Sequence, residues 1–151
     1  MFSSHASGGS CGKPVSGLTG DNPPVMAPAG EIHLTLGDWA KFAIDQMKGE
    51  TGDGKILKAE SYRTLHTAVP PDADKDPAYA LGWGIKSVID QRPGPYLLHA
   101  GSNGYWFVQI VLCLRHRSGL LIAANAGPDA AADKAENEVI GELLPLLTPA
   151  K

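Results

Sequence analysis

Basic residues are neither abundant nor clustered in this sequence. Thirteen lysines and arginines are set against 16 aspartates and glutamates, for a formal net charge of -3. The one compact basic group, Arg115-His116-Arg117, lies between two apolar runs and is typical of a solvated turn. Since nucleic-acid-binding domains concentrate lysine and arginine on one face, we predict no nucleic-acid partner.

Long apolar runs are also missing. The longest, Tyr105–Leu114 and Gly119–Ala126, are well short of the roughly 20 residues that a membrane-spanning helix needs. The first residues lack both the basic start and the apolar stretch of a secretory signal. The sequence therefore predicts no membrane span and leaves the localisation unspecified.

Cysteine is scarce, and the residues that bind metals are scattered. Cys11 and Cys113 stand in neither a CxxC pair nor a metal-ligand spacing, so they are either two free thiols or one bridge. The histidines show no metal-site spacing, and no glycine-rich loop opens a helix as in nucleotide sites. We expect neither a metal nor an organic cofactor.

The length and composition suit one hydrophobic core. With 151 residues, 43% of them hydrophobic, the chain is expected to form one domain or part of one. Residues 1–30 carry many glycines and prolines without a sustained period of two or 3.6, which indicates irregular chain. The regular patterns all fall in residues 31–151.

Two helices are predicted early in this region. Thr35, with Asp38 three residues on, is a helix-start signal, and Gly49 ends the pattern. A second, shorter helix is predicted at about Lys58–Thr67, before Pro70-Pro71. The residues expected to form the buried face of the first helix are Leu36, Trp39, Phe42, Ala43 and Met47.

Strands are predicted next. Tyr79–Ile89 alternates in the manner of one strand, and Tyr96–His99 reads as a short one between turns at Pro93–Pro95 and Gly101–Gly104. Two apolar runs, Tyr105–Leu114 and Leu120–Ala124, then suggest a hairpin.

A closing helix completes the predicted fold. Asp129–Leu147 is rich in helix-forming residues, and Pro145 should end or kink it. Its apolar stripe is expected to comprise Ala135, Val139, Ile140, Leu143 and Leu144. The predicted fold class is α+β: an antiparallel sheet of three to four strands, two helices before it and a C-terminal helix on it.

The segment His99-Ala100-Gly101-Ser102-Asn103-Gly104 carries the most chemical information. A histidine at the end of a strand is followed by glycines that let another backbone approach closely. Such an edge can bind an extended substrate and aim a backbone N–H at a developing oxyanion. Of the other histidines, we interpret His33 as packed or capping and His66 as a surface residue, and we interpret the three tryptophans as core residues.

Four landmarks occur in an order that resembles one enzyme family. These are Pro28-Ala29-Gly30 before the first helix, Tyr79-Ala80-Leu81-Gly82-Trp83-Gly84, His99-Ala100-Gly101, and Asn125-Ala126-Gly127 after the last apolar strand. Together they resemble the C-terminal part of serine β-lactamases and penicillin-binding-protein-like hydrolases, in particular the class C and esterase-like members. The resemblance covers about residues 5–147 and implies that residues 31–151 are the C-terminal portion of such a domain.

The resemblance assigns roles to the strand-end segment. His99 would be the cationic or hydrogen-bonding residue of the family's third motif, and Gly101 its glycine. Ser102 would present its backbone N–H as half of the oxyanion hole. Ala100, Asn103 and Gly104 would contact the substrate, a small-molecule or peptide-like acyl compound. Members of this family are often extracytoplasmic.

The family's nucleophile is not found where it should be. It is the serine of an S-x-x-K helix start, with a Y-x-N or S-x-N pair further on. The one S-x-x-K string, Ser10-Cys11-Gly12-Lys13, contains Gly12 and is followed by Pro14, both of which oppose a helix. It also precedes the Pro-Ala-Gly landmark where the family has a loop, with His5 near a W-G-H-like region. We therefore expect the nucleophile motif, the helical domain and the first sheet strands to be absent.

Three hypotheses follow. The first is a hydrolase portion that acts on a β-lactam, peptide or ester only with an N-terminal half. The second is a non-catalytic binding or self-associating domain derived from that family, since open apolar edges tend to pair. The third is thiol or serine chemistry at Ser10 and Cys11.

Overall fold

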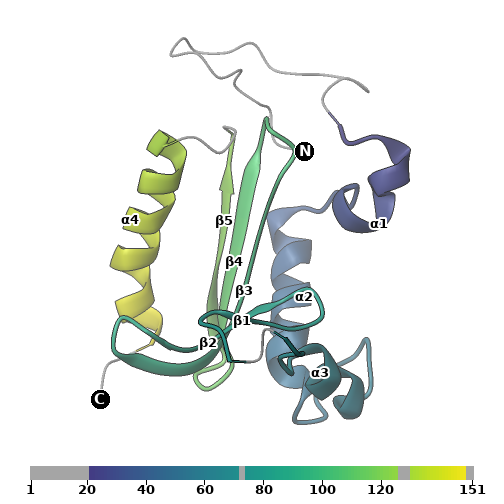
Figure 1. Cartoon of the computed structure of the whole chain (residues 1–151), viewed down its shortest axis with the longest axis vertical. Coiled ribbons are helices and arrows are strands. Elements are labelled where there is room, and N and C mark those ends of the chain that lie inside the picture. The colour runs from purple at the N-terminus through teal and green to yellow at the C-terminus, as the bar shows by residue number, and fades with distance from the viewer. Residues whose placement is uncertain (1–20, 72–73, 126–129, 149–151) are drawn as a thin grey trace.

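The computed structural model describes residues 21–71, 74–125 and 130–148. Figure 1 shows a sheet with helices on both sides. The elements, in chain order, are η2 (Pro24–Met26), α1 (Ala27–Gly30), α2 (Leu36–Gly49), α3 (Ala59–Leu65), β1 (Ala78–Tyr79), β2 (Gly84–Ile89), β3 (Arg92–Ser102), β4 (Phe107–Cys113), β5 (Ser118–Ala124) and α4 (Ala130–Leu147).

The strands form one antiparallel sheet in the order β1-β2-β3-β4-β5. The α+β class is confirmed, but the expectation of three to four strands is wrong, because the described residues form five. The predicted strand Tyr79–Ile89 is a hairpin rather than one strand. Gly82 has a φ of +87°, and the Ala80 N–H donates to the Trp83 carbonyl at 2.7 Å, so the chain reverses between β1 and β2.

β3 is longer than expected at both ends. The chain reverses before it at Asp90 and Gln91, whose φ angles are 53° and 62°, and not at Pro93–Pro95. These prolines lie before Tyr96, where pairing with β4 starts, so they remove few hydrogen bonds from the ladder. At its other end β3 continues through Gly101 and Ser102, two residues of the turn predicted at Gly101–Gly104.

The sheet is covered on both faces. Side chains along each strand point alternately to the two faces of the sheet. On one face, Leu97, Ile110 and Leu112 pack against Ala43 of α2. On the opposite face, Tyr96, Val111 and Cys113 pack against Leu144 of α4. Figure 1 shows α2 and α4 on opposite sides of the strands. The strand β4 is accordingly buried on both faces, which explains its nearly continuous apolar sequence.

The start of α2 is as the sequence predicts. The Thr35 hydroxyl accepts a hydrogen bond from the Asp38 N–H at 3.1 Å and donates to the Asp38 carboxylate at 2.8 Å. Gly49 is the last residue of the helix. Trp39, Phe42, Ala43 and Met47 contact the core, whereas Leu36 is 47% exposed and does not.

The stripe predicted for α4 is only partly right. Ile140 and Leu144 contact the sheet together with Leu147. Val139 and Leu143 are instead 40% and 41% exposed. Pro145 lies inside the helix, which continues to Leu147 and so does not end there.

The N-terminal segment is partly described. Within residues 1–30, predicted as irregular, Pro24–Met26 and Ala27–Gly30 form short helical turns, and residues 1–20 lie outside the described part. Of the helices in the described ranges, none has the length and apolar character required to cross a bilayer.

Candidate functional site: the free edge of β3

The last four residues of β3 have a strand on one side only. Tyr96–Ser102 pairs with β4, with His99 opposite Ile110 and Ser102 opposite Phe107. On the other side, pairing with β2 stops at Leu98, which lies opposite Gly84. Within the described residues, His99–Ser102 therefore has a free edge on the β2 side.

The backbone direction at this edge follows from the ladder. The Leu114 N–H donates to the Pro95 carbonyl at 3.0 Å, and the register between β3 and β4 is unbroken. Hydrogen-bonded pairs alternate along an antiparallel ladder, so His99 and Gly101 direct their N–H and C=O groups toward β4. The corresponding groups of Ala100 and Ser102 point to the free edge.

A tight turn fixes the end of this edge. The Ser102 hydroxyl donates to the Trp106 carbonyl at 2.6 Å and accepts from the Gly104 N–H at 2.9 Å. The Asn103 side-chain oxygen accepts from the N–H groups of Tyr105 and Trp106 at 3.1 and 3.2 Å. Gly104 has a φ of +90°, a conformation that favours glycine. These hydrogen bonds fix the turn, and the Ser102 N–H remains directed to the free edge of β3.

Gly101 is not required by the packing of the chain. A Cβ at this position would have one neighbour within 4 Å, Val108 Cγ2 at 3.9 Å, which is an ordinary contact. By the alternation of side chains, Gly101 and His99 lie on the same face as Leu97, which is the face covered by α2. His99 is exposed. The glycine thus leaves open space beside an exposed histidine, as a site for another molecule needs.

The structure brings together the residues predicted for the third motif. His99, Ala100, Gly101 and Ser102 form the free edge, and Asn103 and Gly104 form the turn after it. The Ser10 and Cys11 pair, with His5 and Gly127, lies outside the described residues. Cys113 is a buried free thiol in β4.

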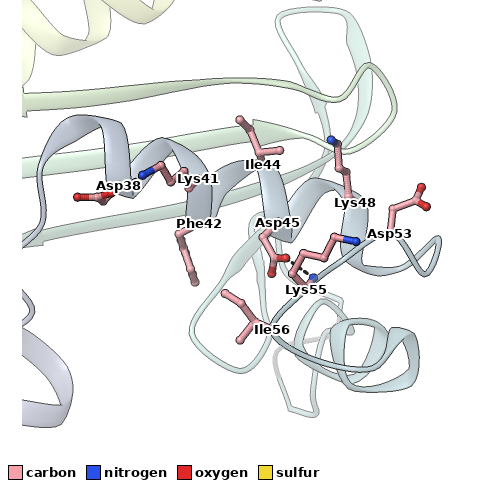
Figure 2. Close-up of a pocket in the computed structure, with 9 residues that line it drawn as sticks. All are labelled: Asp38, Lys41, Phe42, Ile44, Asp45, Lys48, Asp53, Lys55 and Ile56. Carbon is pink, nitrogen blue, oxygen red and sulfur yellow. Dashed lines mark hydrogen bonds and ion pairs between the residues drawn. The ribbon is translucent and has the colours of Figure 1, made fainter.

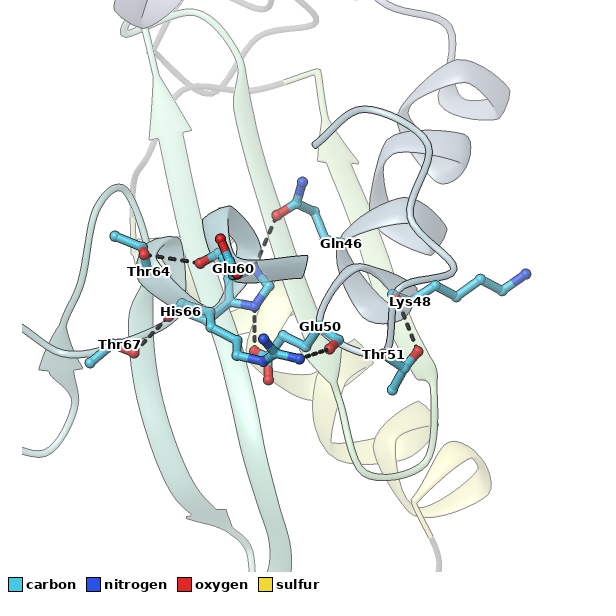
Figure 3. Close-up of polar contacts among 9 residues, drawn as sticks. Gln46, Lys48, Glu50, Thr51, Glu60, Thr64, His66 and Thr67 are labelled. Carbon is cyan, nitrogen blue, oxygen red and sulfur yellow. Dashed lines mark hydrogen bonds and ion pairs between the residues drawn. The ribbon is translucent and has the colours of Figure 1, made fainter. Parts of the chain in front are cut away.

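A buried polar cluster was missed by the sequence analysis. His66 is not a surface residue as predicted: its side chain is 2% exposed. Its Nδ1 lies 2.7 Å from a Glu50 carboxylate oxygen and its Nε2 3.1 Å from the Gln46 amide oxygen (Figure 3). The ring also contacts Tyr62 and Trp83, which explains why it is buried between α2, α3 and the sheet. The polar residues Gln46 and Glu50, next to the apolar stripe of α2, were the sequence signal for a buried polar contact on this side of the helix.

Tyr62 occupies the centre of this cluster. It is fully buried, its hydroxyl donates to the Asp45 carboxylate, and it accepts from the N–H groups of Ile56 and Leu57 at 3.3 and 3.2 Å. Burial, with the Asp45 hydrogen bond, raises the pKa of Tyr62. A phenol held neutral against a carboxylate, deep in the fold, is typical of a structural contact.

A groove on the outer side of α2 is lined by α2 and the loop after it (Figure 2). Its lining holds Asp38, Asp45 and Asp53 with Lys41, Lys48 and Lys55, so the two signs of charge are equal in number. The Lys41 hydrogen bond, at 2.7 Å, lowers the pKa of Asp38, and that contact raises the pKa of Lys41. The Asp45 carboxylate is used by Tyr62 and by the Lys55 N–H. These engaged groups favour a structural interpretation of the groove.

Neither the search for metal-binding groups nor the comparison with known proteins gives a further candidate site. Among the residues in the described ranges, no group of three histidines, cysteines or acidic residues could hold a metal ion. No model of a known protein family matches the sequence, and no curated protein matches it significantly. The free edge of β3 is therefore the candidate functional site.

Proposed function

We propose that this chain is the C-terminal portion of a serine hydrolase of the β-lactamase and penicillin-binding-protein-like family, performing acyl transfer from a β-lactam, peptide or ester. It acts only with an N-terminal portion that supplies the serine, the lysine and the tyrosine. His99 positions the carboxylate or carbonyl of the substrate, and the Ser102 N–H donates to the oxyanion.

The observation that carries the proposal is the direction of the Ser102 N–H. This group points to the free edge of β3. His99 lies three residues earlier, on the face of the sheet that packs against α2, and its side chain is exposed there. The donor is held by a strand on one side and by the 102–106 turn at its end, so it needs no rearrangement to meet a developing negative charge.

An exposed apolar surface supports the view that part of the enzyme is supplied by another portion. It runs from η2 to the start of α2 and includes Val25, 86% exposed, and Ile32, 77% exposed. Met26, Leu34 and Leu36 are also exposed there. Exposed apolar side chains this frequent in one short stretch of chain favour a surface that another polypeptide covers.

The first experiment uses the chain by itself. We expect no turnover of a chromogenic β-lactam or a p-nitrophenyl ester, and no mass increase with a serine-directed acylating probe, because the nucleophile is absent. Turnover that disappears in Ser10→Ala would contradict this interpretation of Ser10 and support chemistry at Ser10 and Cys11.

The second experiment supplies the missing half. A polypeptide carrying S-x-x-K and Y-x-N is co-expressed with the chain, and acyl transfer is expected to appear. Ser102→Pro removes the outward N–H without breaking a bond to β4, and should lower kcat by about 10²–10³-fold. Ser102→Ala also lacks the hydroxyl that holds the turn but keeps the N–H, so its loss should be far smaller. Equal losses in the two variants would contradict the oxyanion role.

A non-catalytic, self-associating domain is the second candidate. It is favoured by one observation: no strand in the described part of the chain pairs with the outer edge of β5.

A further inference from the structure

The turn after β3 contains the one Asn-Gly pair of the sequence, Asn103-Gly104. The other asparagines precede residues with side chains: Asn22 precedes Pro23, Asn125 precedes Ala126 and Asn137 precedes Glu138. The backbone nitrogen that follows an asparagine can attack the side-chain carbonyl carbon, and glycine obstructs this approach least because it has no Cβ. The most reactive asparagine of the chain is therefore expected in the candidate site itself.

Gly104 leaves room for this attack. Its φ is +90°, it is exposed, and a Cβ at this position would have no neighbour within 4 Å. Its N–H donates to the Ser102 hydroxyl at 2.9 Å, and Ser102 is also exposed. Because this hydrogen bond lies at the surface and not within the sheet ladder, solvent base can reach the N–H proton. The nucleophile and its target are in neighbouring residues, so the reaction is intramolecular.

The carbonyl group that is attacked is already polarised. Oδ1 of Asn103 accepts hydrogen bonds from the N–H groups of Tyr105 and Trp106, at 3.1 and 3.2 Å. Attack on Cγ places negative charge on this oxygen, and donors that already point at it stabilise that charge. The two contacts that fix the turn therefore also favour the reaction.

We propose that Asn103 is a modification site, which in the folded chain loses ammonia and becomes aspartate or isoaspartate. The Gly104 nitrogen gives its proton to solvent base and forms a bond to Asn103 Cγ. The bond from Cγ to the side-chain nitrogen breaks, and this nitrogen takes up a proton and leaves as ammonia. Water then opens the resulting succinimide ring at either carbonyl. The reaction consumes one water, releases one ammonia and requires no oxidant or cofactor.

The two products affect the turn differently. Aspartate leaves the backbone unchanged, and its carboxylate still accepts from the Tyr105 and Trp106 N–H groups. Isoaspartate instead places Cβ and Cγ in the main chain, which lengthens the backbone between Ser102 and Gly104. The Gly104 N–H then no longer fits against the Ser102 hydroxyl, and the turn that fixes the end of β3 is lost. The modification acts on the free edge of β3 whether or not the chain is a hydrolase portion.

Peptide mapping by mass spectrometry tests the proposal on the full chain, kept in mildly alkaline buffer at physiological temperature. Asn103 should gain the mass difference between an amide and an acid several-fold faster than Asn125 or Asn137. Isoaspartate O-methyltransferase with a labelled methyl donor should mark the same peptide. The label is assigned peptide by peptide, since Asp53-Gly54 can form isoaspartate without a change of mass.

Two variants separate this reaction from general ageing of the chain. Gly104→Ala adds a Cβ next to the attacking nitrogen and should slow the conversion of Asn103 several-fold. Because alanine is strained at a φ of +90°, circular dichroism checks that this variant is folded. Asn103→Gln keeps an amide but requires a larger ring, so no conversion is expected at that position.

NMR spectroscopy tests the structural consequence. In the isoaspartate form, the amide resonances of Ser102 and Gly104 should move away from those of the fresh chain. Asn103→Asp is the matched control, because it has the added charge but an ordinary backbone, and it should keep the pattern of the fresh chain.

Conversion of Asn103 in urea but not in the folded chain overturns the proposal, because the turn would then protect the side chain. Equal rates at Asn103, Asn125 and Asn137 also overturn it. An isoaspartate form whose Ser102 and Gly104 resonances match those of Asn103→Asp contradicts the effect on the β3 edge.

Discussion

Tyr62 joins three segments that are separate in the sequence. From α3, its hydroxyl reaches Asp45 of α2 and the backbone at Ile56 and Leu57. Its ring fits against two glycines, since a Cβ at Gly49 or Gly54 would come within 2.2 or 2.6 Å of it. The absence of side chains at these two positions is what allows the ring to be fully buried.

Tyr62→Phe should therefore be costly for its size. The ring still fits, but the Asp45 carboxylate loses its donor and two N–H groups lose an acceptor, so we expect the free energy of unfolding to fall by about 2–3 kcal/mol. Urea denaturation measures the change. Tyr96→Phe is the matched control, since Tyr96 is also fully buried but its hydroxyl lies beside the neutral side chains of Thr148 and Cys113 rather than a carboxylate. Equal effects in the two variants would contradict the role of the Asp45 contact.

The two buried tyrosines also predict how stability depends on pH. Burial raises the pKa of both Tyr62 and Tyr96 above the ordinary value of 10.0. The unfolded chain then loses these protons at a lower pH than the folded chain, so stability is complete below about pH 10 and falls above it. Each tyrosine should contribute a slope of up to about 1.4 kcal/mol per pH unit.

Urea midpoints from about pH 8 to 12 check this expectation. The decline should be shallower in a Tyr62→Phe/Tyr96→Phe double variant, in which neither group titrates. An unchanged slope in that variant would assign the alkaline transition to other groups.

The candidate site is formed by the C-terminal end of β3. His99 and Gly101 form bonds to β4, whereas the N–H groups of Ala100 and Ser102 face the free edge. Amide hydrogen exchange by NMR should therefore alternate along the strand, slow at residues 99 and 101 and fast at residues 100 and 102. Leu97 and Leu98, which have strands on both sides, should both exchange slowly. Slow exchange at Ser102 would mean that its N–H is already occupied and would count against the oxyanion role.

The free edges of β3 and β5 differ in character, although both belong to one sheet. The β3 edge is four residues long and carries an exposed histidine and a glycine. The β5 edge is seven residues long, apolar and flanked by an exposed helix surface. A short polar edge suits a small extended ligand, whereas a long apolar edge suits another strand.

In the whole molecule, the sheet is stabilised from both faces. Leu144 of α4 is 3% exposed and packs with Tyr96, Val111 and Cys113 on one face. Leu144→Ala should lower the free energy of unfolding by about 2–5 kcal/mol, through lost burial and a cavity. Leu143→Ala, one position away on the 41% exposed flank, should cost much less. Urea denaturation compares the two variants, and similar losses would contradict the observed orientation of α4.

Local sequence patterns were sufficient to predict several helices and strands. The Thr35 and Asp38 signal located the start of α2, because a cap is formed by residues three apart in the chain. The β4–β5 hairpin followed from two apolar runs joined by a short polar segment. The α+β class follows from these elements together.

Other features depended on contacts between distant residues. The stop of β2 opposite Leu98, which frees the edge of β3, is set by the turn at Gly82 and the register, and neither is visible in alternation alone. His66 was predicted at the surface, and no prediction was made for Tyr62, because the burial of both depends on polar partners 16 to 20 residues away. Which flank of α4 meets the sheet was also undetermined, since Val139 and Leu143 are as apolar as Ile140 and Leu144.

The sequence by itself determined the helix start at Thr35, the final hairpin and the segment His99–Gly104 as the place to look for chemistry. These are local: each depends on residues within a few positions of one another. Only the tertiary structure decided that the Ser102 N–H points to the free edge of β3, that β5 is the last strand of the sheet in the described residues, and that polar side chains fill the α2–α3 corner. Strand register and helix orientation are set by long-range packing, which short sequence patterns do not encode.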